Sequence, residues 1–276
     1  MQEGPLRPTT MNIVVLVKYV PDATGDRQFE EDLTVDRVNV DGLLSELDEY
    51  AVEQALQIKE KRGGDGGEEV QVTALTVGPQ AAEAAVRKAL QMGADKGVHV
   101  IDDAIAGSDA VATSLVLAKA IEKIGKFDLV IGGLAGTDSM MSVVPAMLAE
   151  RLGLPQVTQA SVVETQGDQV RIKRDGDVAT EVIGATMPLV LSVTDQSGEA
   201  RYPSFKGIMA AKKKPVETWS LADLGVDADQ VGLSVAWTAV EEATARPPRT
   251  AGEIVKDEDG SGAKALAEFL ASKKFI

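Results

Sequence analysis

Three glycines lie within five positions directly after a short apolar run, and this spacing is suited to binding an anion. The run is Leu129–Ile131, and the glycines are Gly132, Gly133 and Gly136. Because glycine has no side chain, the backbone can come close to a ligand there. Thr137–Ser139 follows and offers side chains that can cap a helix, whose free N–H groups and positive dipole end would face a phosphate. The stretch therefore predicts a phosphate site between a buried strand and a helix.

The glycine spacing by itself does not identify a class of nucleotide-binding protein. It lacks the G-x-G-x-x-G pattern of dinucleotide sites, and no Gly-Lys-Ser/Thr of a P-loop follows it. An ordinary tight connection between strand and helix would also explain the glycines. Between Leu129 and Met147, however, only Asp138 is ionisable, which favours a site enclosed by protein over a solvated loop.

The residue types present restrict other chemistry. The sequence has no cysteine, which excludes disulfides, thiolate metal ligands and cysteine nucleophiles within it. Its one histidine, His99, lies inside an apolar run and is interpreted as a structural residue. The sequence shows no set of nucleophile, base and orienting residue, so we expect a chain without catalytic residues of its own. Met140 and Met141 are open to two interpretations, contact with a flavin or adenine ring and packing in the core.

The composition is that of an acidic globular protein with an aliphatic core. Of 276 residues, 44% are hydrophobic and only 4% aromatic, which suits helices packed on a parallel sheet. The formal net charge of −15 disfavours binding to nucleic acid or to an anionic membrane. With no signal-peptide pattern at its start, the chain is expected to be cytoplasmic. Residues 1–10 are expected to be a disordered leader or tag, since Met11 directly precedes the first apolar run.

Strand-like and helical patterns alternate from residue 12 to residue 152. This alternation predicts an α/β fold with a doubly wound, mostly parallel sheet of the Rossmann type. Strands are expected at 12–20, 70–77, 97–101 and 129–131, and helices at 45–61, 81–92, 109–124 and up to 152. Ligands of such sheets bind at the carboxyl ends of the strands, so the loops that leave those ends should converge.

The pattern changes to short strand-like runs from residue 156 onward. Gly167-Asp168 and Asp175-Gly176-Asp177 suit hairpin turns between these runs, which predicts antiparallel strands that extend the same sheet. We expect a nucleotide-binding α/β domain over residues 11–215. Residues 216–276 are expected to form a C-terminal arm that packs on a partner subunit and ends in a helix at 263–273.

The stretch Arg201–Lys214 reverses the acidic character of the chain. It carries five positive charges and no negative one, together with Phe205, Ile208 and Met209. A cationic helix end would explain the charges. The alternative is a docking segment, in which an apolar anchor surrounded by lysines contacts an acidic partner.

Several motifs, taken in order, resemble the beta subunit of electron-transfer flavoprotein. They are Val17–Asp22 (V-K-Y-V-P-D), Glu49–Ala55, Lys88–Val100, Arg201–Pro203 and Ile208–Lys214. The resemblance covers nearly the whole chain from Met11 on. It implies an adenine nucleotide alpha hydrolase-like fold and an alpha subunit that holds most of an FAD, while the beta subunit supplies one wall near the flavin and binds a structural AMP.

The resemblance also implies site residues. The AMP pocket of the family, carried over by position, consists of Leu16, Ser45, Glu46, Leu47, Asp48, Val77, Gly133, Leu134, Ala135, Gly136, Thr137, Asp138, Ser139, Met140, Met141, Ser142, Val143 and Val144. The docking segment of the family matches Arg201, Tyr202, Phe205, Lys206, Ile208 and Met209, with Phe205 as the anchor. The implied function is electron carriage from acyl-CoA dehydrogenases or other dehydrogenases to a membrane-bound quinone oxidoreductase.

The loop after residue 133 departs from the family pattern. Many members have several aspartates followed by Gln-Thr-Gly, whereas here only Asp138 matches. Two alternatives therefore stay open. Some relatives bind a second FAD in place of AMP and use it to bifurcate electrons. A stand-alone adenine-nucleotide-binding regulatory protein is the other alternative, but it would leave Arg201–Lys214 without a role.

Overall fold

The computed structural model describes residues 10–25, 27–64, 67–248, 250, 252, 254–257 and 259–276. The predicted leader lies outside the described residues except for Thr10. The chain divides into a larger unit that ends at Glu241 and a smaller unit, Glu242–Ile276, and each is described by itself.

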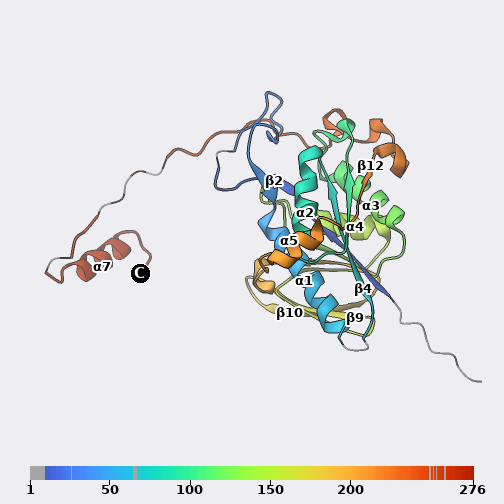
Figure 1. The fold of residues 1–276 in the computed structure, drawn as a ribbon. Coiled ribbons are helices and arrows are strands. Elements are labelled where there is room, and N and C mark those ends of the chain that lie inside the picture. Colours follow the sequence, from blue (N-terminus) through green and yellow to red (C-terminus); the bar gives the residue numbers. More distant parts are fainter. Residues whose placement is uncertain are drawn as a thin grey trace, which may run out of the picture. The chain divides into compact units, whose positions relative to one another are not determined.

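Seven strands form the main sheet of the larger unit, and every neighbouring pair in it is parallel (Figure 1). In spatial order they are β12 (Val216–Trp219), β5 (Lys96–Val100), β4 (Val70–Val77), β1 (Met11–Leu16), β6 (Leu129–Gly133), β11 (Leu189–Val193) and β7 (Gln156–Ala160). The central strands are apolar throughout, as strands buried on both faces should be. The predicted parallel sheet is confirmed.

Helices cover both faces of this sheet. The side chains of Ile13 and Val15 lie in one core cluster with α1 and α2, whereas Val14 and Leu16 lie in a second cluster with α3 and α4. These helices are α1 (Glu46–Arg62), α2 (Glu83–Met92), α3 (Ala110–Ile124) and α4 (Val144–Leu152). Alternate residues of one strand thus serve opposite layers, which makes the fold doubly wound.

The first strand is shorter than predicted. Residues 12–20 were expected to form one strand, but β1 ends at Leu16 and a separate strand, β2 (Tyr19–Pro21), pairs antiparallel with β3 (Gly42–Leu44). The backbone N–H of Lys18 donates to the carboxylate of Asp48 at 2.9 Å instead of to a strand. The chain therefore leaves the main sheet at this point.

A separate three-stranded antiparallel sheet follows the parallel part. Its strands are β8 (Val162–Gln166), β9 (Gln169–Asp175) and β10 (Thr180–Thr186), joined by the two predicted turns. The antiparallel strands are confirmed, but they do not extend the main sheet, while β7 and β11 join that sheet in parallel. Val170 and Ile172 of β9 are buried in the same cluster as Leu189 and Leu191, so the small sheet covers the core.

The structure also places the chain after residue 215. Strand β12 pairs with β5, and α6 (Leu221–Leu224) contributes buried leucines, so residues 216–241 belong to the larger unit. The short helix α5 (Phe205–Ala211) precedes β12. The smaller unit contains one described helix, α7 (Gly262–Ser272).

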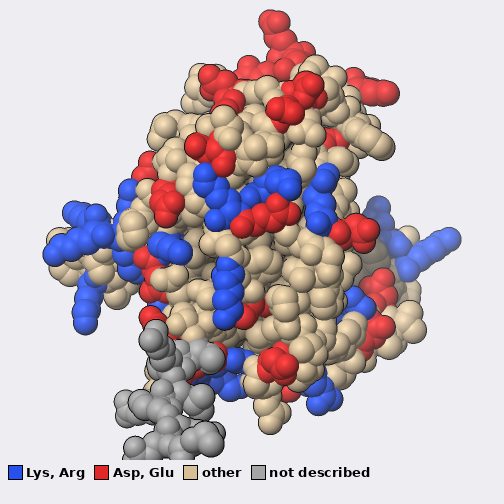
Figure 2. All heavy atoms as spheres, turned by 90° about the vertical axis from the view of Figure 1, so that its right-hand side faces the viewer, with Lys and Arg blue, Asp and Glu red and all other residues tan. Residues whose placement is uncertain are grey.

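Charges of both signs lie side by side on the face in Figure 2, with acidic side chains gathered at its upper end. Among the helices of the described residues, none has the length and apolar character needed to cross a membrane.

His99 is buried, and its Nε2 lies 3.0 Å from the carbonyl oxygen of Gly78, which confirms its structural interpretation.

Candidate functional site

The candidate site lies where the winding of the sheet reverses. From β1 the chain proceeds outward to β4 and β5 and then returns to β6, on the other side of β1. Helix α1 follows β1 on one face of the sheet, and α4 follows β6 on the other. The carboxyl ends of β1 and β6 are adjacent, because Val15 pairs with Ile131. In doubly wound sheets this switch point is the usual ligand site.

The first turn of α1 closes against the end of β6. A Cβ atom on Gly133 would lie 2.5 Å from the carbonyl oxygen of Leu47 and 2.6 Å from Oδ1 of Asp48, so only glycine fits there. The Oγ of Ser45 accepts a hydrogen bond from the N–H of Thr137 at 3.4 Å. The hydroxyl of Thr137 also donates to Glu46 at 3.2 Å. These hydrogen bonds join the beginning of α1 to the loop after β6, about ninety residues later in the sequence.

Asp48 is a buried acid at this junction. Burial raises the pKa of Asp48 to about 7, although the backbone N–H groups of Lys18 and Gly133 and the charge of Lys18 favour its ionised form. The carboxyl group connects the end of β1 to the beginning of α1.

The predicted helix cap at Thr137–Ser139 is wrong. Helix α4 begins only at Val144, and its N-cap residue is Val143, which makes no side-chain cap. The Asp138 side chain is instead 1% exposed and forms ion pairs with Lys18, at 2.8 Å, and with Arg37. The Asp138 carboxylate therefore binds these cations and does not cap a helix. The glycine-rich loop is separated from α4 by residues 137–143.

Burial opposes ionisation of Asp138, but the charges and hydrogen bonds of Lys18 and Arg37 outweigh it and lower the pKa of Asp138 below its ordinary value. Arg27 approaches the same loop, and its Nη2 donates to the carbonyl oxygen of Thr137 at 2.6 Å. Three cationic side chains from the connection between β1 and α1 therefore surround the loop after β6.

Sequence reasoning missed these cations as site residues. Lys18 appeared only within the motif Val17–Asp22, and Arg37 was assigned no role. Between β2 and β3, the described residues contain a single isolated bridge, between Phe29 and Val35. The charge of the two loops gave no signal for these cations, because the connection between β1 and α1 carries seven acidic residues besides these three basic ones.

Met140 and Met141 do not pack in the core. They are 58% and 48% exposed, and Met140 and Ser142 have left-handed backbone conformations with φ of 51° and 58°. A left-handed conformation costs an ordinary residue about 1–2 kcal/mol, which tertiary contacts must offset. The core-packing interpretation is therefore excluded, and the two thioethers lie at the surface of the loop.

The structure brings one part of the predicted pocket together. Contacts join Ser45, Glu46, Leu47 and Asp48 to Gly133 and Thr137. Leu16 ends β1, and the other predicted residues from 134 to 144 lie on the connection from β6 to the beginning of α4. Val77 ends β4, the neighbour of β1 on its other side. It lies at the same edge of the sheet.

The predicted docking residues divide into two groups. Tyr202 and Phe205 are 93% and 81% exposed, and Lys206, Ile208 and Met209 are exposed as well. Arg201 differs from them, because its guanidinium group forms ion pairs with Glu53 and Glu60 of α1. The exposed residues form a surface with apolar and basic character on the short helix α5.

The chain is similar to known proteins over most of its length. An electron transfer flavoprotein domain matches residues 32–224. The chain is 47% identical over 266 residues to the electron transfer flavoprotein subunit beta of Mycobacterium tuberculosis, covering 96% of this chain and 99% of the relative. It is 37% identical over 267 residues to the subunit beta of Thermoanaerobacterium thermosaccharolyticum, covering 96% of this chain and all of the relative.

The subunit beta of Bacillus subtilis is 35% identical over 269 residues, covering 95% of this chain and 98% of the relative. A family named for a flavoprotein that transfers electrons implies a flavin, and a beta subunit implies an alpha subunit as its partner. The match of a family domain over most of the chain and the identity over nearly all of it show that the chain belongs to the electron transfer flavoprotein family, as a beta subunit.

Proposed function

We propose that this chain carries a structural AMP at the switch point of its sheet and, with an alpha subunit, forms one wall of an FAD site. The FAD, when bound, takes up electrons from a dehydrogenase and releases them to an acceptor. The chain itself binds, orients and docks, and supplies no acid, base or nucleophile. We propose acyl-CoA dehydrogenases or other dehydrogenases as donors and a membrane-bound quinone oxidoreductase as the acceptor of a cytoplasmic carrier.

The nucleotide proposal rests on one observation. The glycine-rich loop lies at the switch point, beside basic side chains. Gly133 allows the backbone of β6 to approach the first turn of α1. The N-terminus of this 17-residue helix contributes a positive dipole end. Lys18 and Arg37 share one carboxylate, Asp138, so the three groups together keep a net positive charge that suits a phosphate.

The residue types on the loop also fit a mononucleotide. We propose that Ser45, Thr137 and the backbone of residues 133–137 would bind the polar groups of AMP, while Leu16, Val77 and the exposed Met140 and Met141 would contact the adenine. Of the several aspartates that many members have in this loop, only Asp138 is present here, so backbone groups would supply most of the polar contacts.

Extraction of nucleotides from the purified protein tests the proposal. The chain is expressed with and without an alpha subunit and denatured, and the released nucleotides are identified by chromatography and mass. We expect AMP in both preparations and FAD only in the pair. FAD bound to the chain alone would contradict the AMP assignment.

Two alternatives give different results in the same experiment. Two FAD molecules per pair, without AMP, would identify an electron-bifurcating protein. ATP released from a stable single chain would identify a nucleotide-binding regulatory protein. The observation that disfavours this second alternative is the exposed apolar and basic surface of α5, which a stand-alone regulator does not need.

A further inference from the structure

The segment Arg201–Lys214 was predicted to act as one docking surface, but the structure gives its ends and its middle different environments. Phe205 and Met209 in the middle are exposed. Arg201 at one end and Lys214 at the other face inward and contact helices of the larger unit. The ends and the middle of the segment thus have separate roles.

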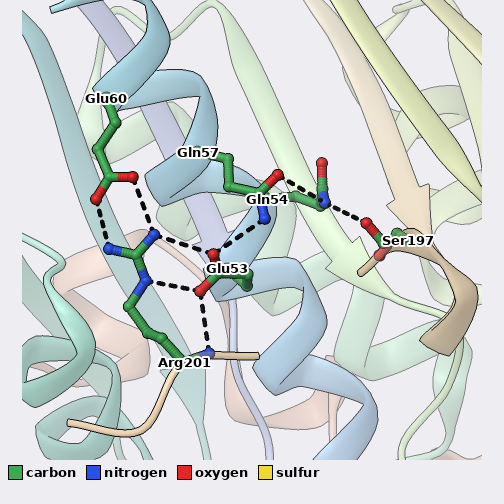
Figure 3. A network of polar contacts seen from close by, with 6 residues as sticks. All are labelled: Glu53, Gln54, Gln57, Glu60, Ser197 and Arg201. Carbon is green, nitrogen blue, oxygen red and sulfur yellow. Dashed lines mark hydrogen bonds and ion pairs between the residues drawn. The ribbon is translucent and has the colours of Figure 1, made fainter. Parts of the chain in front are cut away.

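Arg201 lies between two carboxylates that are two turns apart on α1 (Figure 3). Its Nε and Nη2 donate to Glu53 at 2.7 and 3.0 Å, and its backbone N–H donates to the same carboxylate at 3.1 Å. Its Nη1 and Nη2 donate to Glu60 at 2.5 and 3.1 Å. Every guanidinium nitrogen therefore donates within this chain, and four of its five N–H groups are used.

The network around Glu53 makes this contact specific. The Glu53 side chain is 6% exposed and also accepts a hydrogen bond from Gln57 at 3.0 Å. Burial opposes its ionisation, but hydrogen bonds from Arg201 and Gln57 and the Arg201 charge lower the pKa of Glu53. Next to it, Gln54 donates to the carbonyl oxygen of Ser197 at 2.7 Å (Figure 3). Helix α1 thus fixes the chain on its way into the docking segment.

Lys214 fixes the other end of the segment on α2. Its ammonium group donates to the carbonyl oxygens of Leu90 and Ala94 at 3.0 and 2.6 Å, at the C-terminal end of that helix. Burial lowers the pKa of Lys214. A cation at a helix C-terminus satisfies free carbonyl groups and the negative end of the dipole.

Helix α5 lies directly against α2 between these two ends. A Cβ atom on Gly207 would be 2.5 Å from the carbonyl oxygen of Gln91, and Ala211 is 3% exposed. A helix of seven residues is not stable by itself in water, so its contacts with the larger unit determine its orientation.

We infer that Arg201 is a positioning residue that orients α5 for a dehydrogenase, with Glu53 and Glu60 as its partners, and is not itself a docking contact. The inference rests on the proposed docking function of α5. A docking surface that is already ordered loses less conformational entropy on binding, so its partner binds more tightly. Removal of this ion pair should therefore weaken docking, although Arg201 itself does not contact the partner.

The test compares Arg201→Gln with Val178→Ala in the complex with an alpha subunit and FAD. Val178 is 99% exposed in a turn far along the chain from α5 and serves as the control. Amide hydrogen exchange of residues 205–211 is measured without a dehydrogenase, and electron transfer is then measured against carrier concentration. We expect exchange about tenfold faster in Arg201→Gln, a raised KM and an unchanged kcat, because hydrogen bonds between charged groups are lost.

Exchange at the wild-type rate together with a raised KM would overturn the inference, because Arg201 would then contact the partner directly. Faster exchange with an unchanged KM would overturn the docking role of α5 and leave its fixation by Arg201 intact. If Arg201→Gln does not give a folded complex, Glu60→Gln removes only the more exposed carboxylate. We then expect a smaller acceleration of the same amides, and unchanged exchange would again contradict the inference.

Discussion

The side chain of Asp48 accepts a hydrogen bond from the backbone N–H of Lys18 at 2.9 Å, and this contact joins the first turn of α1 to the end of β1. The carboxyl group is buried between the two segments that form the switch point. The geometry of the candidate nucleotide site therefore depends on an acid whose charge is not fixed at neutral pH.

The titration of Asp48 gives the first prediction. Burial raises its pKa from 3.8 to about 7 in the folded chain. The folded chain thus binds more protons than the unfolded chain between these values, so the stability contributed by Asp48 falls as the pH rises from about 4 to about 7 and is constant above that. We expect a carboxyl signal in 13C NMR that titrates near pH 7 and disappears in Asp48→Asn.

Asp168→Asn is the control for that titration, because it removes an exposed carboxyl group outside the site. Titration of every aspartate signal below pH 5 in the wild-type complex would contradict the prediction.

The ion pairs of Asp138 give the second prediction. Replacing Asp138 with Asn leaves Lys18 and Arg37 near each other without their shared carboxylate. We expect a loss of about 2 kcal/mol in stability, below the range for fully buried pairs because Lys18 is partly exposed. We also expect about tenfold less AMP retained after gel filtration, because Lys18 and Arg37 lose the carboxylate that holds them at the loop, and this loss of position outweighs the added positive charge. Denaturant unfolding and nucleotide extraction measure the two effects, with Asp168→Asn again as control. Full retention of AMP in Asp138→Asn would show that these ion pairs do not contribute to nucleotide binding.

The parallel sheet could be predicted from the sequence because the signals for its strands and helices are local. Apolar runs such as Val70–Val77 are long and are separated by helices with clear end signals, and Asp109 caps α3 where its residue type predicts. The order of the strands and the location of the switch point were not predicted, because they depend on which strands pair; only the position of a ligand at the carboxyl ends of the strands followed from the fold class.

The parts that were not predicted depend on contacts distant in sequence. Asp138 has the residue type of a helix cap, but its partners Lys18 and Arg37 lie 120 and 101 residues away and outcompete that local role. Likewise, nothing near Arg201 indicates that Glu53 and Glu60 bind it from 148 and 141 residues away. Separation of the small sheet depends on packing of β9 against β7, which a local alternating pattern does not specify.

The third prediction concerns the exposed anchor of α5. Phe205→Ala removes the large apolar side chain that projects from the helix, without touching Arg201 or Lys214. We expect KM for transfer from a dehydrogenase to rise about tenfold, as for a hot-spot residue, with FAD content and kcat unchanged. Val178→Ala, also a fully exposed apolar residue, should leave KM unchanged. An unchanged KM in Phe205→Ala would exclude Phe205 as the anchor.

The fourth prediction concerns helix α7 of the smaller unit. Leu266 and Phe269 are 59% and 52% exposed and, three positions apart, lie on one face of the helix. An exposed apolar stripe on an amphipathic helix indicates a binding surface, and we propose the alpha subunit as its partner. In the double variant Leu266→Ser and Phe269→Ser we expect the two subunits to associate about tenfold more weakly, as measured by sedimentation at decreasing concentration.

The matched control lies on the same helix, where Lys264 and Glu268 form an exposed ion pair at 3.8 Å. Changing both of these to serine replaces the same number of residues and lowers the helix propensity by a similar amount. Exposed ion pairs of this kind contribute little to stability, so association of the subunits should be unchanged. Equal weakening in both double variants would mean that helix formation, and not the apolar stripe, determines binding. Full association of the Leu266 and Phe269 variant would show that the alpha subunit binds elsewhere on the chain.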